Sequence, residues 1–133
     1  MENYMFSQSR RKFIRTAATA AAAAPFLIRC SSGGKSPGSK LNHACIGVGG
    51  MGWHDLNKFR EDPNVEIVAI CDVDTDNLKK ASEALPGART YTDWRELLDK
   101  EEKNIDSVNV TVPDHNHFII AWNFIRKKKH VYC

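Results

Sequence analysis

The hexapeptide GVGGMG, residues 47–52, decides the fold of this chain. It follows the apolar run Ala44-Cys45-Ile46 and spaces its glycines as G-x-G-x-x-G. The apolar run predicts a strand over residues 43–48, and the pattern after it predicts a helix over 50–60. Asp72 ends the next apolar run, about 20 positions after the last glycine of the motif. Together these features predict a dinucleotide-binding βαβ unit. The alternative is a glycine turn that serves only the geometry of the fold.

Each position of the turn has an expected role in binding the cofactor. Gly47 allows a tight turn, Gly49 lets main chain approach a pyrophosphate, and Gly52 allows close packing of the helix against the strand. The helix N-terminus, with Gly50 and Met51, offers unpaired N–H groups and a partial positive charge to the phosphates.

Asp72 is expected to accept hydrogen bonds from the hydroxyls of the adenosine ribose. A carboxylate at that place repels a 2′-phosphate, and the following Val73-Asp74 supplies no arginine to receive one. The sequence therefore predicts NAD as the cofactor and disfavours NADP.

From residue 42 onward, short apolar runs alternate with longer amphipathic ones. Further strands are predicted over residues 65–71, 89–91, 107–112 and 130–132, and helices over 75–85, 92–103 and 115–128, with Thr75 as the cap of the first. This order predicts an α/β fold with a doubly wound parallel sheet, the Rossmann fold, in which the fourth strand lies beside the first. Ligands bind where the strand order reverses, so the glycine turn and the loop at 113–117 should both face the cofactor.

That loop reads Pro113-Asp114-His115-Asn116-His117. We expect no metal site from Asp114, His115 and His117, because residues two apart on a helix point away from each other. The four cysteines show no zinc-ligand spacing either. Two interpretations stay open: the loop contacts the cofactor, or Asp114 caps the following helix while the histidines are solvated.

The net charge of +3 originates in residues 1–40, which hold seven Lys and Arg and one acid. The rest of the chain is net acidic, so the sequence shows no electrostatic footprint for a nucleic acid. SRRKFIR, residues 9–15, precedes an uncharged stretch over 16–28 that is too short to span a bilayer. This order resembles a twin-arginine export signal, so we expect residues 1–30 to direct the protein to the periplasm through the twin-arginine export machinery.

The leader also contains Leu27-Ile28-Arg29-Cys30, which resembles a lipoprotein cleavage site except that Arg29 replaces a small residue. A lipid anchor on Cys30 is therefore a second expectation. Residues 31–40 are rich in Ser and Gly and predict a flexible linker, so the folded domain should cover 41–133. The twin-arginine route exports folded proteins, which suits a cofactor acquired in the cytoplasm. Cys45 and Cys71 would be buried before export, as small hydrophobic residues.

The leader, GVGGMG, the segment Cys71-Asp72-Val73-Asp74, the stretch TVPDHNH and the closing KHVYC together resemble the Gfo/Idh/MocA family, the glucose-fructose oxidoreductase and inositol dehydrogenase group. The resemblance covers essentially all of residues 41–133. It implies that Pro113, Asp114 and His117 match a Pro-Asn/Asp-x-x-His motif and lie near the nicotinamide end of the cofactor. It also implies a catalytic lysine in a Glu-Lys-Pro motif directly after a strand like KHVYC. Since the chain ends at Cys133, we expect that lysine, a sixth strand and a substrate-binding domain to belong to a longer protein, which can be a homo-oligomer.

Three functions follow from the resemblance. The first is the cofactor domain of an exported dehydrogenase that passes hydride from a sugar or cyclitol hydroxyl to nicotinamide. The second is an NAD-dependent glycoside hydrolase, in which hydride is removed and then returned. The third is a nucleotide-binding module without enzymatic activity. A small carbohydrate would bind in the substrate domain, so residues 41–133 cannot identify it.

Overall fold

The computed structural model describes residues 39–133, so the predicted signal peptide and nearly all of the predicted linker lie outside the described residues. In chain order the elements are β1 (Leu41–Ile46), α2 (Gly50–Glu61), β2 (Val65–Cys71), α3 (Thr75–Ala84), β3 (Arg89–Tyr91), α4 (Trp94–Glu101), β4 (Ser107–Val110), α5 (Asp114–Arg126) and β5 (His130–Tyr132). Strands and helices alternate throughout this part of the chain, as predicted. Among residues 39–133 no helix has the length and apolar character needed to cross a membrane.

All neighbouring strands are parallel, in the order β3-β2-β1-β4-β5. The fourth strand therefore lies beside the first, and the predicted doubly wound Rossmann topology is confirmed. The strand order reverses between β1 and β4, where Cys45 pairs with Asn109 and Ile46 with Val110. The carboxyl ends of these two strands open the crevice in which such sheets bind ligands.

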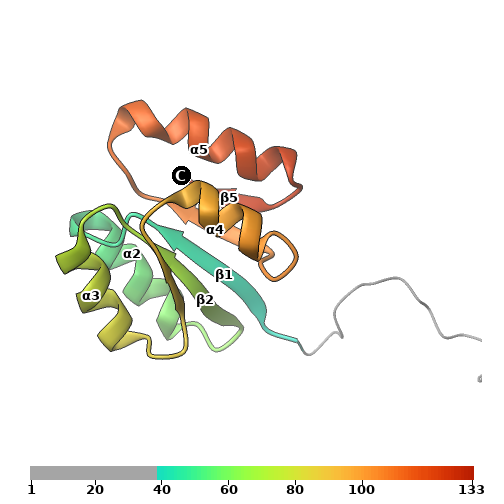
Figure 1. Ribbon diagram of the computed structural model, residues 1–133. Coiled ribbons are helices and arrows are strands. Elements are labelled where there is room, and N and C mark those ends of the chain that lie inside the picture. Colours follow the sequence, from blue (N-terminus) through green and yellow to red (C-terminus); the bar gives the residue numbers. More distant parts are fainter. Residues whose placement is uncertain (1–38) are drawn as a thin grey trace, which may run out of the picture. The chain divides into compact units, whose positions relative to one another are not determined.

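Helices cover the sheet on both faces (Figure 1). α2 and α3 bury Leu56 and Leu78 against one face, together with Cys45 of β1. α4 and α5 bury Leu97 and Phe124 against the other face. The central strands are buried on both sides because each face meets a helix layer, which is typical of parallel sheets.

Two strand ends differ from the sequence prediction. β1 ends at Ile46 and not at residue 48, because Gly47 adopts a φ of 79° and turns the chain out of the sheet. β4 ends at Val110 and not at residue 112. The remaining residues of the two predicted strands, 47–48 and 111–112, instead form the beginnings of the loops that follow β1 and β4.

The predicted cap of α3 needs correction, because an aspartate and not Thr75 caps this helix. Asp74 caps α3 by accepting from the Asp76 N–H at 2.9 Å, so Thr75 is the first helical residue and not the cap. Asp93 caps α4 in the same way, through the N–H of Arg95. Asp114 is not a cap either: Pro113 occupies that position of α5 without a side-chain bond. A carboxylate accepts from an N–H more strongly than a hydroxyl does, which explains the choice of Asp74.

Candidate nucleotide-binding site

The turn between β1 and α2 requires glycine at its first position. Gly47 has a φ of 79°, and its N–H donates to the Cys71 carbonyl at 2.8 Å. A Cβ added at Gly47 would lie 2.1 Å from the carbonyl oxygen of Thr111. At the other end of the turn, a Cβ added at Gly52 would lie 2.0 Å from the Gly47 carbonyl oxygen. The main chain of β1, β4 and α2 therefore meets at closest range here.

The first turn of α2 presents backbone donors. Gly49 is the N-cap residue, and its carbonyl accepts from the Gly52 N–H at 2.9 Å. Within residues 39–133, the N–H groups of Gly49, Gly50 and Met51 have no hydrogen-bond acceptor. No acidic side chain lies in this first turn. Three adjacent N–H groups at a helix N-terminus, with the positive end of the helix dipole, attract an anion such as a phosphate.

Asp72 connects the end of β2 to the glycine turn. Its Oδ2 accepts from the Val48 N–H at 2.8 Å, and its Oδ1 accepts from the Asp74 N–H at 2.9 Å. A carboxylate has about four acceptor sites, so each oxygen retains one for a further donor. Asp72 therefore fixes the turn and can still accept from hydroxyl groups of a ligand. The sequence predicted the second role and missed the first.

Gly47, Gly49 and Asp72 line one cavity of about 510 Å³ at the carboxyl ends of β1 to β4. That volume lies within the range of small-molecule sites in proteins. Four of the predicted site residues line it: Gly47, Gly49, Asp72 and Pro113. The reversal point of the strand order thus coincides with a concave site that combines backbone donors and a carboxylate acceptor.

The other predicted residues do not line this cavity. Gly50 and Met51 follow Gly49 in the first turn of α2, and the Met51 side chain is exposed. Asp114 is exposed at the start of α5. His117 donates through Nε2 to the Val112 carbonyl at 2.5 Å, and its Nδ1 accepts from the Cys133 thiol at 2.9 Å. The His117 ring therefore fixes the loop after β4 and the end of β5.

Two groups of polar and aromatic residues that line the cavity were not predicted from the sequence. One follows β3, whose carboxyl end lies at the same sheet edge: Thr92, Asp93, Trp94 and Arg95. The Arg95 guanidinium lies 4.6 Å from the centre of the Trp94 ring and 3.3 Å from Asp93. The predicted topology could have indicated these residues, because the carboxyl ends of all strands of a parallel sheet lie at the same edge. The other group, Asn77 and Asn116, comes from the first turns of α3 and α5.

Asn77, in the first turn of α3, faces the glycine turn. A Cβ added at Gly49 would lie 2.4 Å from Asn77 Nδ2, which donates to Asp74 Oδ2 at 3.2 Å. The neighbour of Gly49 is thus the end of a side chain and not main chain. A larger residue at position 49 can therefore be accommodated by movement of Asn77, while it fills space in the cavity.

The cysteines near the site are buried and protonated. Burial raises the pKa of the Cys71 thiol to about 12, with a further contribution from the charge of Asp72. Burial likewise raises the pKa of Cys45 far above its ordinary value. Residues 39–133 contain no group of three or more His, Cys, Asp or Glu side chains arranged to hold a metal ion. The side chains of His115 and His117 contact different partners, Asn116 and Val112.

Known proteins share both the sequence and the fold of this part of the chain. The family described as "Oxidoreductase family, NAD-binding Rossmann fold" (GFO_IDH_MocA) matches residues 41–133. A glycosyl hydrolase family 109 protein of Stenotrophomonas maltophilia is 34% identical over 88% of this chain and 27% of its own length. Myo-inositol 2-dehydrogenase from Lactobacillus plantarum superimposes with a TM-score of 0.67 at 27% identity, over 71% of this chain and 28% of that one. GenD2 from gentamicin A biosynthesis, in complex with NAD, superimposes with a TM-score of 0.64 at 26% identity, over 74% of this chain and 27% of that one.

Proposed function

The chain belongs to the Gfo/Idh/MocA oxidoreductase family, and from this premise we propose that the cavity at the carboxyl edge of its sheet binds NAD through the glycine turn and Asp72. One observation carries the proposal: Gly49, the first of three adjacent residues whose N–H groups have no acceptor within residues 39–133, lines the same cavity as Asp72, whose carboxylate has free lone pairs. A diphosphate is bound by N–H donors at a helix N-terminus, and a ribose diol donates hydrogen bonds to a carboxylate. This combination of N–H donors and a carboxylate acceptor therefore fits a dinucleotide.

The individual residues contribute binding and orientation. Gly49, Gly50 and Met51 donate to the diphosphate, and the lack of a side chain at Gly49 keeps the approach open. Asp72 accepts from the adenosine ribose and disfavours a 2′-phosphate by charge repulsion. We propose that Pro113, Asp114 and His117 act near the nicotinamide end, with His117 fixing the loop through Val112. When bound, the nicotinamide ring supplies the hydride acceptor.

The chain spans about 27% of the length of the relatives described above, so a reaction is proposed only for a protein that contains it. We propose the transfer of hydride between a sugar or cyclitol hydroxyl and nicotinamide. The structural likeness to myo-inositol 2-dehydrogenase supports this reaction. A second candidate is an NAD-dependent glycoside hydrolase, which the identity to the glycosyl hydrolase family 109 protein favours. Net NADH formation from a free sugar would support the dehydrogenase, and its absence during hydrolysis of a glycoside would support the hydrolase.

Titration of the purified chain with NAD and with NADP tests the binding site, with intrinsic fluorescence or calorimetry as the readout. We expect NAD to bind more tightly than NADP. Gly49→Val should weaken both cofactors at least about tenfold, because its side chain enters the cavity where the diphosphate is received. Gly87→Ala is the matched control, since Gly87 has open space around it and lies in a distant turn. Normal NAD binding by Gly49→Val would show that the phosphate site is wrongly placed.

Export is proposed on the sequence of the leader alone. We propose that residues 1–30 direct the folded protein through the twin-arginine machinery to the periplasm, with Cys30 as the candidate lipid-anchored residue. A reporter fused to residues 1–40 should reach the periplasm, and changing both Arg10 and Arg11 to Lys should retain it in the cytoplasm. Incorporation of labelled fatty acid that disappears in Cys30→Ala would support the anchor.

A further inference from the structure

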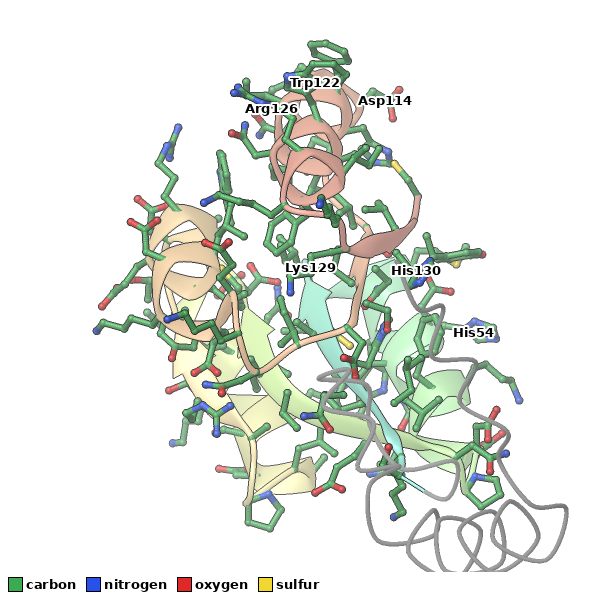
Figure 2. The ribbon with its side chains drawn as sticks, turned by 90° about the vertical axis from the view of Figure 1, so that its right-hand side faces the viewer. His54, Asp114, Trp122, Arg126, Lys129 and His130 are labelled. Carbon is green, nitrogen blue, oxygen red and sulfur yellow. The ribbon has the colours of Figure 1, made fainter. Side chains whose placement is uncertain are left out.

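The outer side of α5 carries a row of four exposed side chains at every fourth position: Asp114, Phe118, Trp122 and Arg126. The buried side of the same helix uses Ile120 and Phe124. Figure 2 shows Trp122 pointing away from the domain, with Asp114 and Arg126 on its two sides. Positions four apart form one of the ridges by which helices pack against each other.

The middle of the row is aromatic and open to solvent. Phe118 is 74% exposed and Trp122 is 48% exposed, and their rings stack with centroids 6.2 Å apart. Ile119 and Ile125 are exposed beside them. A contiguous apolar patch of this kind, bordered by charged residues, is typical of an interaction surface.

The two ends of the row carry opposite charges. Neither Asp114 nor Arg126 has a hydrogen bond or ion pair through its side chain within the part of the chain that the structure describes. The adjacent Lys127, in contrast, pairs with Glu102 at 2.8 Å. The row therefore has an acidic end, two aromatic rings and a basic end.

This order is complementary to itself when reversed. If a second α5 lies antiparallel across the first, Asp114 faces Arg126 of the other copy and Phe118 faces its Trp122. A two-fold axis between the two aromatic positions produces both contacts twice, as an isologous dimer requires. We propose that the outer face of α5 binds a second copy of this chain in this antiparallel arrangement.

The charges favour a second copy over other occupants. A lipid surface with anionic headgroups would meet Asp114 at the same depth as the aromatic rings, at a cost in desolvation and repulsion. Another copy of α5 supplies a cation at that place and an anion at the other end. Since one helix pair buries less surface than a standard interface, the dimer should be weak and sensitive to salt. None of the four residues of the row lines the cavity. Asp114 is also proposed to act near the nicotinamide end, so self-association is measured without cofactor.

Charge reversal provides a specific test, measured by sedimentation velocity of the full chain up to about 100 μM. Asp114→Arg alone and Arg126→Asp alone should each weaken self-association about tenfold or more, since both end contacts of the dimer become repulsive. An equimolar mixture of the two variants should associate as tightly as the original chain, because both end contacts are then attractive in the heterodimer. The loss in each single variant together with the recovery in the mixture indicates antiparallel pairing, because a parallel pairing would place like charges together already in the original chain and neither single change would weaken it.

Two controls separate the interface from folding. Lys128→Asp changes the charge of the chain by the same amount as Arg126→Asp but lies outside the row, and it should leave association unchanged. Trp122→Ala should weaken association while its far-ultraviolet circular dichroism stays the same. A chain that remains monomeric at the highest concentration overturns the proposal. So does a mixture that fails to recover, or a face that binds anionic vesicles without forming dimers.

Discussion

At the scale of single residues, Asp72 fixes the glycine turn and is proposed to bind the ribose, and these two roles predict different results for two substitutions. Asp72→Asn keeps one oxygen that can accept from the Val48 N–H, so the glycine turn should persist. The loss of charge then removes the repulsion of a 2′-phosphate, and the ratio of the NADP and NAD dissociation constants should fall about tenfold. Competitive titration of the two cofactors measures this ratio.

Asp72→Ala is the contrasting variant. It leaves the part-buried Val48 N–H without its acceptor, which costs about 1–3 kcal/mol. Affinity for both cofactors should then fall, because the turn that holds the diphosphate is no longer fixed. Equal behaviour of the Asn and Ala variants would mean that the bond to Val48 does not matter for binding. The ribose-binding role of Asp72 was predicted from its spacing after the glycines. The sequence did not predict the Val48 bond, which depends on the side-chain rotamer in the folded turn.

Gly47 and Gly50 form a second residue pair with contrasting predictions. Both have positive φ angles, 79° and 50°, but only a Cβ at Gly47 would collide with main chain, at Thr111. Gly47→Ala should therefore lower the free energy of unfolding by more than about 3 kcal/mol. Gly50→Ala has open space and should cost only about 1–2 kcal/mol for the left-handed backbone. Urea unfolding of the two variants compares these costs, and similar losses would contradict the proposed main-chain contact.

At the scale of elements, a chain of polar side chains joins β1, β4 and α2 through the core. His43 of β1 shares hydrogen bonds with Ser107 Oγ at 2.7 Å and Asn109 Oδ1 at 3.2 Å. Asn109 donates to Thr111, whose hydroxyl donates to Asp55 of α2 at 3.0 Å. This network could not be predicted, because residues two apart on a strand share a face but the side chains that meet them from other elements are known only in the folded structure. It connects the elements that carry the glycine turn.

His43 makes the stability of these elements depend on pH. Burial lowers the pKa of His43 from 6.5 to about 4, against a smaller opposing effect of the hydrogen bond with Asn109. Below pH 6.5 His43 becomes protonated in the unfolded chain, whereas in the folded chain it stays neutral down to about pH 4. Stability should therefore fall as the pH decreases through this window, by about 2 kcal/mol between pH 7 and pH 5. Urea midpoints at the two pH values measure the change.

His43→Gln provides the control for this pH dependence. Glutamine keeps a donor and an acceptor but does not titrate, so the loss between pH 7 and pH 5 should become smaller. The other histidines of the folded part would remain in both proteins. An unchanged pH dependence in His43→Gln would assign the acid sensitivity to other groups.

Element order followed from hydrophobic periodicity alone, whereas element ends did not. The alternation of runs predicted all five strands and four helices of residues 41–133, because burial on both faces of a parallel sheet enforces it. The ends depended on single hydrogen bonds, as at Asp74 and Asp93, where each side chain competes with a neighbouring threonine for the cap. The exposed face of α5 could not be predicted for another reason: apolar residues lie on several sides of this helix, and the sequence does not show which side meets the sheet.

At the scale of the whole molecule, the cofactor should stabilise the fold. A ligand that binds only the folded state adds about 2.7 kcal/mol at a free concentration 100 times its dissociation constant. For a folded part of this size, that gain corresponds to a rise in Tm of about 10 °C or more. NAD should therefore raise the Tm in thermal unfolding, and NADP at the same concentration should raise it less, because of Asp72. Gly49→Val should unfold at a similar temperature without ligand, since only Asn77 must move, but should show almost no rise in Tm with NAD.

Because this rise in Tm depends on NAD concentration and self-association depends on protein concentration, varying each separately distinguishes the cofactor site from the α5 interface. A Tm that does not respond to NAD in a folded chain would remove the support for the nucleotide site while leaving the α5 interface untouched.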